Sequence, residues 1–233
     1  MRREDFSVGS FVHVMKRGAR RTDIVRDKAD RWRFLKLIRY LNDSNVPRNW
    51  ERDITPEHIK SGFQRPHHWG KPQPYVSVLA FCLMDNHFHL LLQERTEGGI
   101  AKFMQRVCTS MAAYFNAKYA ESGTLFQGAY KARTVKTDEQ LQYLAAYINV
   151  KNPFERYPSG FEHAVREFDT AFQWAQNDPF SSLADYAQKP NSALLDHSLI
   201  REVFLHGEHF RNFSRDMVLG RALIDDEDIL MID

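Results

Sequence analysis

Residues 79–92 read Leu79-Ala-Phe-Cys-Leu-Met-Asp-Asn-His-Phe-His-Leu-Leu-Leu92. The run is largely apolar on both sides of Asp85-Asn86, and each side is long enough for a short strand. Asp and Asn favour turns because their side chains bond nearby backbone groups and tolerate left-handed conformations. The pattern therefore predicts two buried strands joined by a tight reversal at Asp85-Asn86.

The second of these strands begins with His87-Phe88-His89. Side chains alternate between the faces of a strand, so His87 and His89 point one way and Phe88 points the other. Two imidazoles on one rigid face can bind a divalent ion, although the pair is also compatible with histidines that are simply hydrogen-bonded or exposed. Their position at the start of a core strand favours a metal site. With an oxygen donor, Mg²⁺ or Mn²⁺ suits a phosphate site, and Zn²⁺ is also compatible.

The composition is that of a globular protein, because 43% of the 233 residues are hydrophobic and 27% are charged. No apolar run approaches the roughly 20 residues of a membrane-spanning helix, and the first residues lead into no signal-peptide core. We therefore expect a cytoplasmic protein. Only Cys82 and Cys108 are present, which excludes a disulfide framework and a cysteine-rich zinc site.

The formal charge of +2 hides a polarity along the chain. Residues 1–161 hold 26 Lys and Arg against 16 Asp and Glu, whereas residues 162–233 hold 6 against 14. Scattered lysines often mark only a solvated surface, but a basic domain is also the electrostatic footprint of a nucleic-acid-binding protein. The acidic end, at −8, suggests that it covers the basic face and competes with DNA.

Hydrophobic periodicity, caps and breakers predict the remaining elements. They are a strand at 10–17, a helix at 28–41 capped by Asp27, a helix at 100–120, a strand at 123–135 and a helix from 139 to about 152 that Pro153 stops. Five prolines make 42–74 a largely irregular connection with a short helix after Thr55. Further on, the pattern predicts a helical stretch at 161–176 and two or three short helices between 182 and 220.

This order of elements predicts an α/β (α+β) fold, a ferredoxin-like antiparallel sheet with helices packed on one face. We expect residues 1–160 to form this domain, with 42–74 as an irregular insertion. Residues 161–233 are expected to add an acidic helical extension. In such a fold the face with His87 and His89 can meet the helix that carries Tyr147.

Four pieces of the chain resemble, in order and spacing, the single-tyrosine HUH transposases. They are Met84-Asp-Asn-His-Phe-His-Leu-Leu-Leu92, then Met104-Gln105 with Tyr114-Phe-Asn-x-x-Tyr119, then Gly123-Thr-Leu-Phe-Gln-Gly-Ala-Tyr-Lys131, and Tyr147-Ile-x-x-x-Asn152-Pro153. The tail, with Phe180-Ser-Ser-Leu-x-Asp-Tyr186 and Leu194-Leu-Asp196, is most similar to the REP-associated tyrosine transposases of the IS200-like branch. The resemblance covers residues 10–160 well and the tail loosely.

The resemblance implies an enzyme that cleaves and joins single-stranded DNA, with a DNA hairpin as partner. His87 and His89 match the family's metal-binding pair, and Tyr147 matches its nucleophile, with Tyr143 as the spare candidate. Attack by Tyr147 implies a 5′-phosphotyrosine intermediate that needs no ATP. A phenol with an ordinary pKa of about 10 needs a nearby cation to react at neutral pH, and the metal supplies it in this family. Relatives resemble both homodimers and monomers.

Two positions depart from the family pattern. The third metal ligand normally lies four residues after the tyrosine, but Lys151 stands there, and a protonated lysine cannot coordinate a cation. A π-bulge would bring Asn152, one residue later, under Tyr147, and Asn149 and Gln140 are the other candidates. The second departure is Ala129, where the family often has a basic residue that contacts DNA.

The remaining expectations concern DNA contacts. The phosphate backbone is expected to contact Arg17, Arg20, Lys131, Arg133 and Lys151. Tyr130 or Phe126 can stack on bases.

Two other readings remain open. One is a domesticated or inactive relative that binds structured DNA without cutting it. The other is a metal-dependent nucleotide hydrolase of the histidine-triad kind, which Leu91 disfavours because it replaces the third alternating histidine. His67-His68 are expected to be exposed loop residues, although a metal or partner contact is the alternative.

Overall fold

The computed structural model describes residues 6–187 and 192–220, so the acidic stretch at 225–233 lies outside the described residues. Its centre is a four-stranded antiparallel sheet with the order β2-β3-β1-β4. The strands are β1 (Phe11–Arg17), β2 (Val76–Leu83), β3 (His87–Glu94) and β4 (Lys131–Val135). The ferredoxin-like sheet and the hairpin at Asp85-Asn86 are thereby confirmed.

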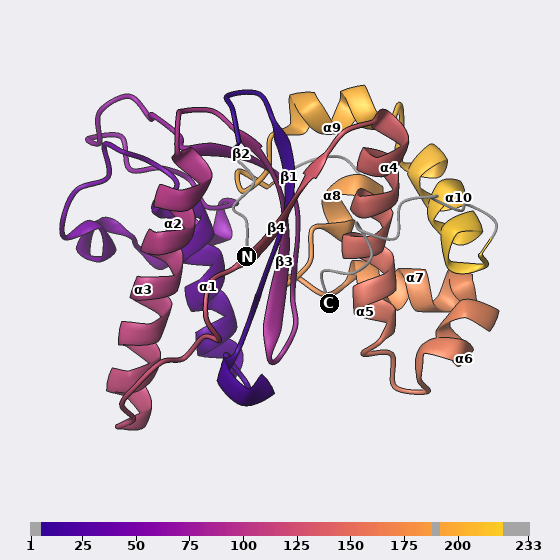
Figure 1. Ribbon diagram of the computed structural model, residues 1–233, viewed down its shortest axis with the longest axis horizontal. Coiled ribbons are helices and arrows are strands. Elements are labelled where there is room, and N and C mark those ends of the chain that lie inside the picture. The colour runs from indigo at the N-terminus through magenta and orange to yellow at the C-terminus, as the bar shows by residue number, and fades with distance from the viewer. Residues whose placement is uncertain (1–5, 188–191, 221–233) are drawn as a thin grey trace.

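Helices cover both faces of the sheet, as Figure 1 shows. On one side lie α1 (Lys28–Tyr40), α2 (Pro56–Lys60) and α3 (Gly99–Tyr119), with the short 3₁₀ helices η1 (Ala19–Arg21) and η2 (Trp50–Asp53) elsewhere in the chain. On the other side lie α4 (Asp138–Ala146), the π-helix η3 (Tyr147–Lys151), α5 (Asn152–Phe154), α6 (Phe161–Arg166), α7 (Phe168–Gln176), α8 (Leu183–Ala187), α9 (His197–Val203) and α10 (Gly207–Val218). The expectation of helices on one face was wrong. Its cause lies in β2 and β3, which are buried at nearly every position and are therefore covered on both sides.

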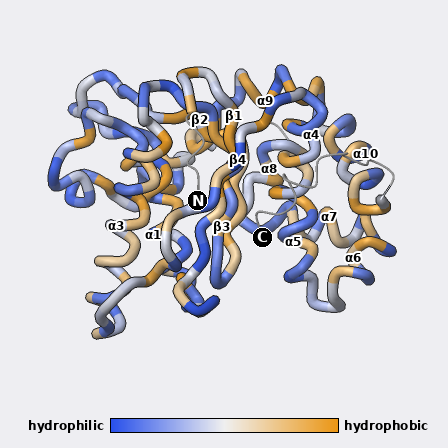
Figure 2. The backbone as a smooth tube through the Cα atoms, in the orientation of Figure 1, coloured by the Kyte–Doolittle hydropathy of each residue, from blue (hydrophilic) through white to orange (hydrophobic). Residues whose placement is uncertain are grey.

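The face toward α1 and α3 is an ordinary apolar core. Phe88, Leu90 and Leu92 of β3 are fully buried there, and the Phe88 ring lies 4.8 Å from that of Phe34 on α1. Figure 2 shows hydrophobic residues concentrated in the strands and hydrophilic ones in the outer loops. Alternation within β3 therefore separates a packing face from the face that carries His87 and His89.

A buried carboxylate ties α1 to α3. Asp27 caps α1 by accepting from the backbone N–H of Asp30 at 2.9 Å, as predicted. The fully buried Asp30 in turn accepts from Lys118 at 2.6 Å and from the Tyr119 hydroxyl at 2.7 Å. Burial opposes the charge on Asp30, but the hydrogen bonds from Lys118, the Arg26 backbone and Tyr119 outweigh it and lower its pKa to about 2.

Two predicted element boundaries were wrong. The strand expected at 123–135 is regular only over β4, because Gly123 and Gly128 adopt φ values of +94° and +49° that break an extended backbone. The helix expected to stop at Pro153 continues into α5. Pro153 lies directly after the π-helix, where the register of the backbone hydrogen bonds changes.

The C-terminal segment is docked along the outer edge of β2. The backbone N–H of Leu83 donates to Phe180 O at 2.9 Å, and that of Asp196 donates to Val78 O at 2.9 Å. Ser182 is fully buried between two elements, since its Oγ accepts from the Phe81 N–H at 2.9 Å and donates to Asn149 Oδ1 on η3 at 2.6 Å. The tail therefore contacts both the sheet and the π-helix.

The connection at 42–74 forms little regular structure beyond η2 and α2, and it packs through aromatic rings. The Tyr40 ring of α1 lies 5.6 Å from Trp50 and 5.9 Å from Trp69. His67 and His68 are exposed, and His68 Nε2 lies 3.1 Å from Asp53 Oδ2. Within the described part of the chain, no helix is long and apolar enough to cross a membrane.

Candidate active site

The polar face of the sheet collects side chains from three strands. Arg17 is paired with His87, and Met15 is paired with both His89 and Lys131. His13 is likewise paired with Arg133 on β4. Because paired residues of antiparallel strands point to the same face, histidines and cations from β1, β3 and β4 share one surface.

His89 and His13 form a buried pair on this face. His13 Nε2 and His89 Nδ1 are 2.9 Å apart, the rings are stacked with centroids 5.2 Å apart, and the two residues are 1% and 0% exposed. Burial, followed by the nearby His13, His87, Lys151 and Arg17, holds the pKa of His89 well below its ordinary value. His89 is therefore neutral at physiological pH, which is the form that binds metals.

His87 is half-buried beside this pair, with its ring 5.0 Å from that of His89. Its Nδ1 lies 2.6 Å from Asn86 Oδ1, so the turn residue orients the ring. His13 was missed in the sequence. The available signal was its place among the apolar residues of a predicted strand, but nothing local indicates that this strand pairs with β3.

Tyr147 is the first residue of the π-helix that follows α4. Thr137 caps α4 by accepting from the backbone N–H of Gln140 at 3.2 Å, and the N–H of Asn152 donates to the Tyr147 carbonyl, five residues back. The π-bulge considered for this position is thus confirmed. It directs the Tyr147 ring onto the polar face, with centroids 6.0 Å from His89 and 6.5 Å from His13.

Lys151 stands directly beside the Tyr147 hydroxyl. Its Nζ donates to Tyr147 Oη at 3.2 Å, lies 4.7 Å from the centre of the ring, and pairs with Glu155 at 2.5 Å. An ammonium at this distance stabilises a phenolate relative to a phenol. The residue that departs from the family pattern therefore places a positive charge beside the Tyr147 hydroxyl. Tyr143, the spare candidate, stacks on Tyr147 at 6.5 Å.

The candidates for a third metal ligand differ in how many hydrogen bonds their side-chain amides already make. Asn149 is occupied, because its amide donates to Ala145 O at 3.0 Å and its Oδ1 accepts from Ser182. The side-chain oxygen of Gln140 accepts from the Lys136 backbone N–H at 2.8 Å. Asn152 is buried, and its Nδ2 has no hydrogen-bond partner in the part of the chain that the structure describes. A metal would be bound by the side-chain oxygen of Asn152, and the Nδ2 that lacks a partner among the described residues leaves the amide as a whole less engaged than those of Asn149 and Gln140.

The donor set suits a divalent ion held by imidazoles. His87 and His89 share one face, and His89 is neutral. Among residues 6–187 and 192–220, however, no group of three His, Cys, Asp or Glu side chains is arranged to hold a metal. A third protein ligand would therefore come from another residue type, and the amide of Asn152 is compatible with this.

The predicted DNA-contacting residues divide into two groups. Arg17 and Lys131 line a cavity of about 340 Å³ beside the histidines, together with Met15, Arg21, Gln127, Gly128 and Ala129. Arg20 is exposed outside this cavity, and Arg133 is half-buried farther along β4. Of the two aromatic candidates, Phe126 is buried and packs 6.1 Å from Phe88, so it belongs to the core, whereas Tyr130 is half-buried.

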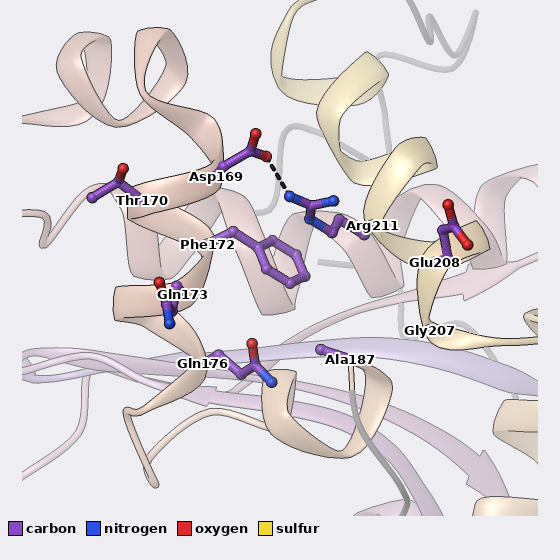
Figure 3. Close-up of a pocket in the computed structure, with 9 residues that line it drawn as sticks. All are labelled: Asp169, Thr170, Phe172, Gln173, Gln176, Ala187, Gly207, Glu208 and Arg211. Atoms are coloured by element: carbon purple, nitrogen blue, oxygen red, sulfur yellow. Dashed lines mark hydrogen bonds and ion pairs between the residues drawn. The ribbon is translucent and has the colours of Figure 1, made fainter.

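A larger cavity lies away from the histidines. It has a volume of about 520 Å³ and lies among α7, α8 and α10, where Asp169 pairs with Arg211 at 2.6 Å (Figure 3). Its nine lining residues are polar or small apart from Phe172, and none comes from the sheet. The site chemistry therefore does not involve this cavity.

Comparison with known proteins finds a similar family over part of the chain. Residues 71–151 match the model of a family described as "Transposase IS200 like". A solved structure described as "Structure of the REP associates tyrosine transposase bound to a REP hairpin" is 12% identical and aligns over 83% of this chain and 88% of that chain, with a TM-score of 0.46. No curated protein matches the chain. The matched segment includes β2, β3, α3, β4, α4 and η3 and holds His87, His89 and Tyr147, so over this part the chain is similar to the IS200-like transposases.

Proposed function

We propose that this protein cleaves single-stranded DNA and transfers the strand through a covalent link to Tyr147, and that its substrate carries a hairpin. The supporting observation is the position of the Tyr147 ring, 6.0 Å from His89 on the polar face, within the segment that matches a transposase family. Transposition needs a nucleophile and a phosphate-activating group on one surface, and this surface offers both.

The proposed reaction exchanges one phosphodiester for another. The Tyr147 Oη attacks the scissile phosphorus, the bond to the 3′-oxygen breaks, and the departing oxygen takes up a proton as a 3′-hydroxyl. The 5′-phosphate stays attached to Tyr147 as a phosphotyrosine ester. A second 3′-hydroxyl then displaces the phenolate and restores a phosphodiester, so no ATP is consumed.

Neighbouring side chains would prepare the phenol. The Lys151 ammonium donates to Tyr147 Oη, and Glu155 holds Lys151 in place from the next turn. His87 and His89 would hold a divalent ion, Mg²⁺ or Mn²⁺, with Asn152 as the proposed third ligand. When bound, such an ion polarises a phosphate oxygen and stabilises the negative charge that develops on it.

The site is closed in this structure. Tyr147 is only 7% exposed and His89 is 0% exposed, so a phosphodiester cannot reach between them without movement. The π-helix offers a place for that movement, since wide turns of this kind are less regular than an α-helix and are frequent at functional sites. DNA binding is thus proposed to displace the Tyr147 side chain from the histidine pair.

The positive residues around the site would hold the DNA backbone. Arg17 and Lys131 line the cavity beside the histidines, Arg20 and Arg133 lie farther out, and Lys151 lies on η3. Each phosphate that is neutralised releases counterions, so binding should weaken steeply as salt rises.

The experiment is a covalent-adduct assay on the full chain. Single-stranded hairpin DNA labelled at its 3′ end is incubated with the protein and Mg²⁺ or Mn²⁺, then separated on a denaturing gel. We expect a labelled adduct from the wild type and from Tyr143→Phe, and none from Tyr147→Phe. An adduct that persists in Tyr147→Phe contradicts the nucleophile assignment.

A second function is favoured by one observation. Lys151 occupies the usual position of a metal ligand, and an ammonium repels a cation at that point. The protein would then bind structured single-stranded DNA without cutting it. If the wild-type chain binds the hairpin but forms no adduct with either metal, this alternative is supported and the cleavage proposal is contradicted.

A further inference from the structure

The cavity beside the histidines has the size of a small-molecule site. Its volume of about 340 Å³ lies at the lower end of the range for pockets that hold a compact ligand. Met15 contributes an apolar side chain to its lining, and Arg17, Arg21 and Lys131 contribute positive charges. Gln127 adds an amide that can both donate and accept. The lining contains no carboxylate, so the cavity is suited to an anionic ligand with a flat or apolar part.

The loop on one side of the cavity holds a strained backbone. Arg20 and Arg21 have φ values of 53° and 62°, a left-handed region that residues with a side chain seldom adopt, and here two occur in succession. Gly18 precedes them because a Cβ at that position would lie 2.0 Å from Thr22 O. Strain of this kind persists where the surrounding structure enforces it, often at ligand sites. Both side chains are exposed, but only Arg21 contributes to the cavity lining.

Backbone hydrogen bonds fix this loop to its neighbours. Gly18 N–H donates to Asn86 O at 2.8 Å, Ala19 N–H to Leu125 O at 2.9 Å, and Gln127 N–H to Arg17 O at 2.9 Å. On the other face of β1, Lys16 Nζ donates to the Gly128 carbonyl. Three segments distant in sequence therefore form a preorganised cavity, and preorganisation lowers the entropic cost of binding.

One polar atom near the cavity lacks a partner. The Nε–H of Arg17 is buried, and in the described part of the chain no acceptor lies within hydrogen-bond distance of it. A buried donor without an acceptor is destabilising, and a ligand oxygen would provide the missing acceptor. Arg17 is also paired with His87 across the β1–β3 ladder, so an anion bound by Arg17 would lie next to the histidine site.

We propose that this cavity binds a single unpaired nucleotide of the DNA strand, next to the phosphate that is cut. Arg17, Arg21 and Lys131 hold its phosphate, Met15 contacts the base, and Gln127 reads the base edge through its amide. The inference rests on the proposed function and adds to it a subsite that selects sequence by direct contact. Gln127 and Arg21 thereby become specificity-determining residues.

The test uses the full chain without added metal and four probes, the 2′-deoxynucleoside 5′-monophosphates, with inorganic phosphate as the comparison. Binding is followed by calorimetry and by NMR of arginine Nε–H and glutamine amide signals. We expect at least one nucleotide to bind about tenfold more tightly than phosphate. Gln127→Ala should level the preference among the four bases.

The neighbouring arginines give a matched control. Arg21→Gly and Arg20→Gly remove the same charge, and glycine accepts the positive φ at both positions. We expect Arg21→Gly to weaken mononucleotide binding about tenfold. Arg20 is proposed to contact only the DNA backbone outside the cavity, so Arg20→Gly should change mononucleotide binding less than twofold while it weakens binding of hairpin DNA. Inorganic phosphate that binds as tightly as every nucleotide, equal effects of the two variants, or no binding would each overturn the proposal.

The adduct assay separates failure of the subsite from failure of the proposed function. An adduct at Tyr147 without nucleotide binding in the cavity overturns the subsite alone. Nucleotide binding that depends on Arg21, without an adduct, supports the subsite and contradicts cleavage.

Discussion

The two faces of the sheet are built from alternate residues of the same strands, yet they serve different purposes. Toward α1 and α3, the fully buried Phe88 and Leu90 pack in an apolar core. Toward η3, the neighbouring His87 and His89 lie with His13 against Tyr147. One strand therefore directs apolar side chains toward α1 and α3 and two histidines toward η3.

The difference shows how a polar site can exist inside a small domain. His89 is buried without being charged, because burial, the neighbouring histidines and nearby cations lower its pKa and favour the neutral form. Their polar atoms are used within the site, as in the His13–His89 contact at 2.9 Å. Substitutions on the apolar face should therefore lower stability, and substitutions on the polar face should mainly lower activity.

The largest expected effect belongs to the apolar face. Phe88→Ala should lower the free energy of unfolding by about 3–5 kcal/mol, because it removes a fully buried ring and leaves a cavity. Denaturant unfolding of the full chain measures it. His87→Ala, one residue away on the other face, is the control and should change stability by about 1 kcal/mol or less. Equal losses in the two variants would contradict the division between the faces.

The second effect is catalytic and belongs to the polar face. His87→Ala should slow adduct formation by roughly 10²–10³-fold, or about 2.7–4 kcal/mol, the usual effect of removing one group that stabilises transition-state charge. Single-turnover rates on hairpin DNA measure it. Gln93→Ala provides a control on the same strand and face, farther from Tyr147, and should react at the wild-type rate. A wild-type rate in His87→Ala would remove His87 from the site.

A smaller effect is expected where the tail meets the polar side. Ser182→Ala leaves Asn149 Oδ1 and the Phe81 N–H without their buried partner, which should cost about 1–3 kcal/mol of stability. Chemical denaturation of both proteins measures the loss. Ser198→Ala removes an exposed hydroxyl that bonds Asp196, and it should cost about 0.5 kcal/mol or less. If both variants are equally stable, the tail does not support the π-helix through Ser182.

The last effect concerns Asp30, beneath the apolar face, and it is recognised by its dependence on pH. Its pKa in the folded protein is about 2, below the value of about 3.9 expected in the unfolded chain. The folded form therefore binds fewer protons, so the stabilisation is complete above about pH 4 and disappears as pH falls through about 2. Urea unfolding of wild type and Asp30→Asn across this range should show a stability difference that shrinks toward low pH. A difference independent of pH would contradict the pKa assignment.

Much of the site was predictable because its signals are local. The turn at Asp85-Asn86 and the two-residue spacing of His87 and His89 follow from strand geometry. The extra residue between Tyr147 and Asn152 indicated a π-bulge, which the structure contains. The strand predicted at 123–135 was too long because two glycines within it adopt left-handed conformations. The helix end predicted at Pro153 was too early because the helix continues from the π-turn into α5.

Other features depend on contacts that no local pattern specifies. Helices cover the second face because the tail returns to the edge of β2, through bonds such as Leu83 N–H to Phe180 O at 2.9 Å. The contact of Lys151 with the Tyr147 hydroxyl depends on the side-chain directions that the π-helix sets. The sequence identified Lys151 as a departure but not the contact that it makes.

The chain's own order of residues determined the alternation of β3, the tight turn before it and the tyrosine on a widened helix, because each depends on neighbours within a few positions. Only the tertiary structure decided that His13 joins His89, since the two lie 76 residues apart and meet through strand pairing. It likewise formed the cavity with Arg21 and Gln127 from separate loops. Long-range pairing is set by the total packing of the core, which no short stretch contains.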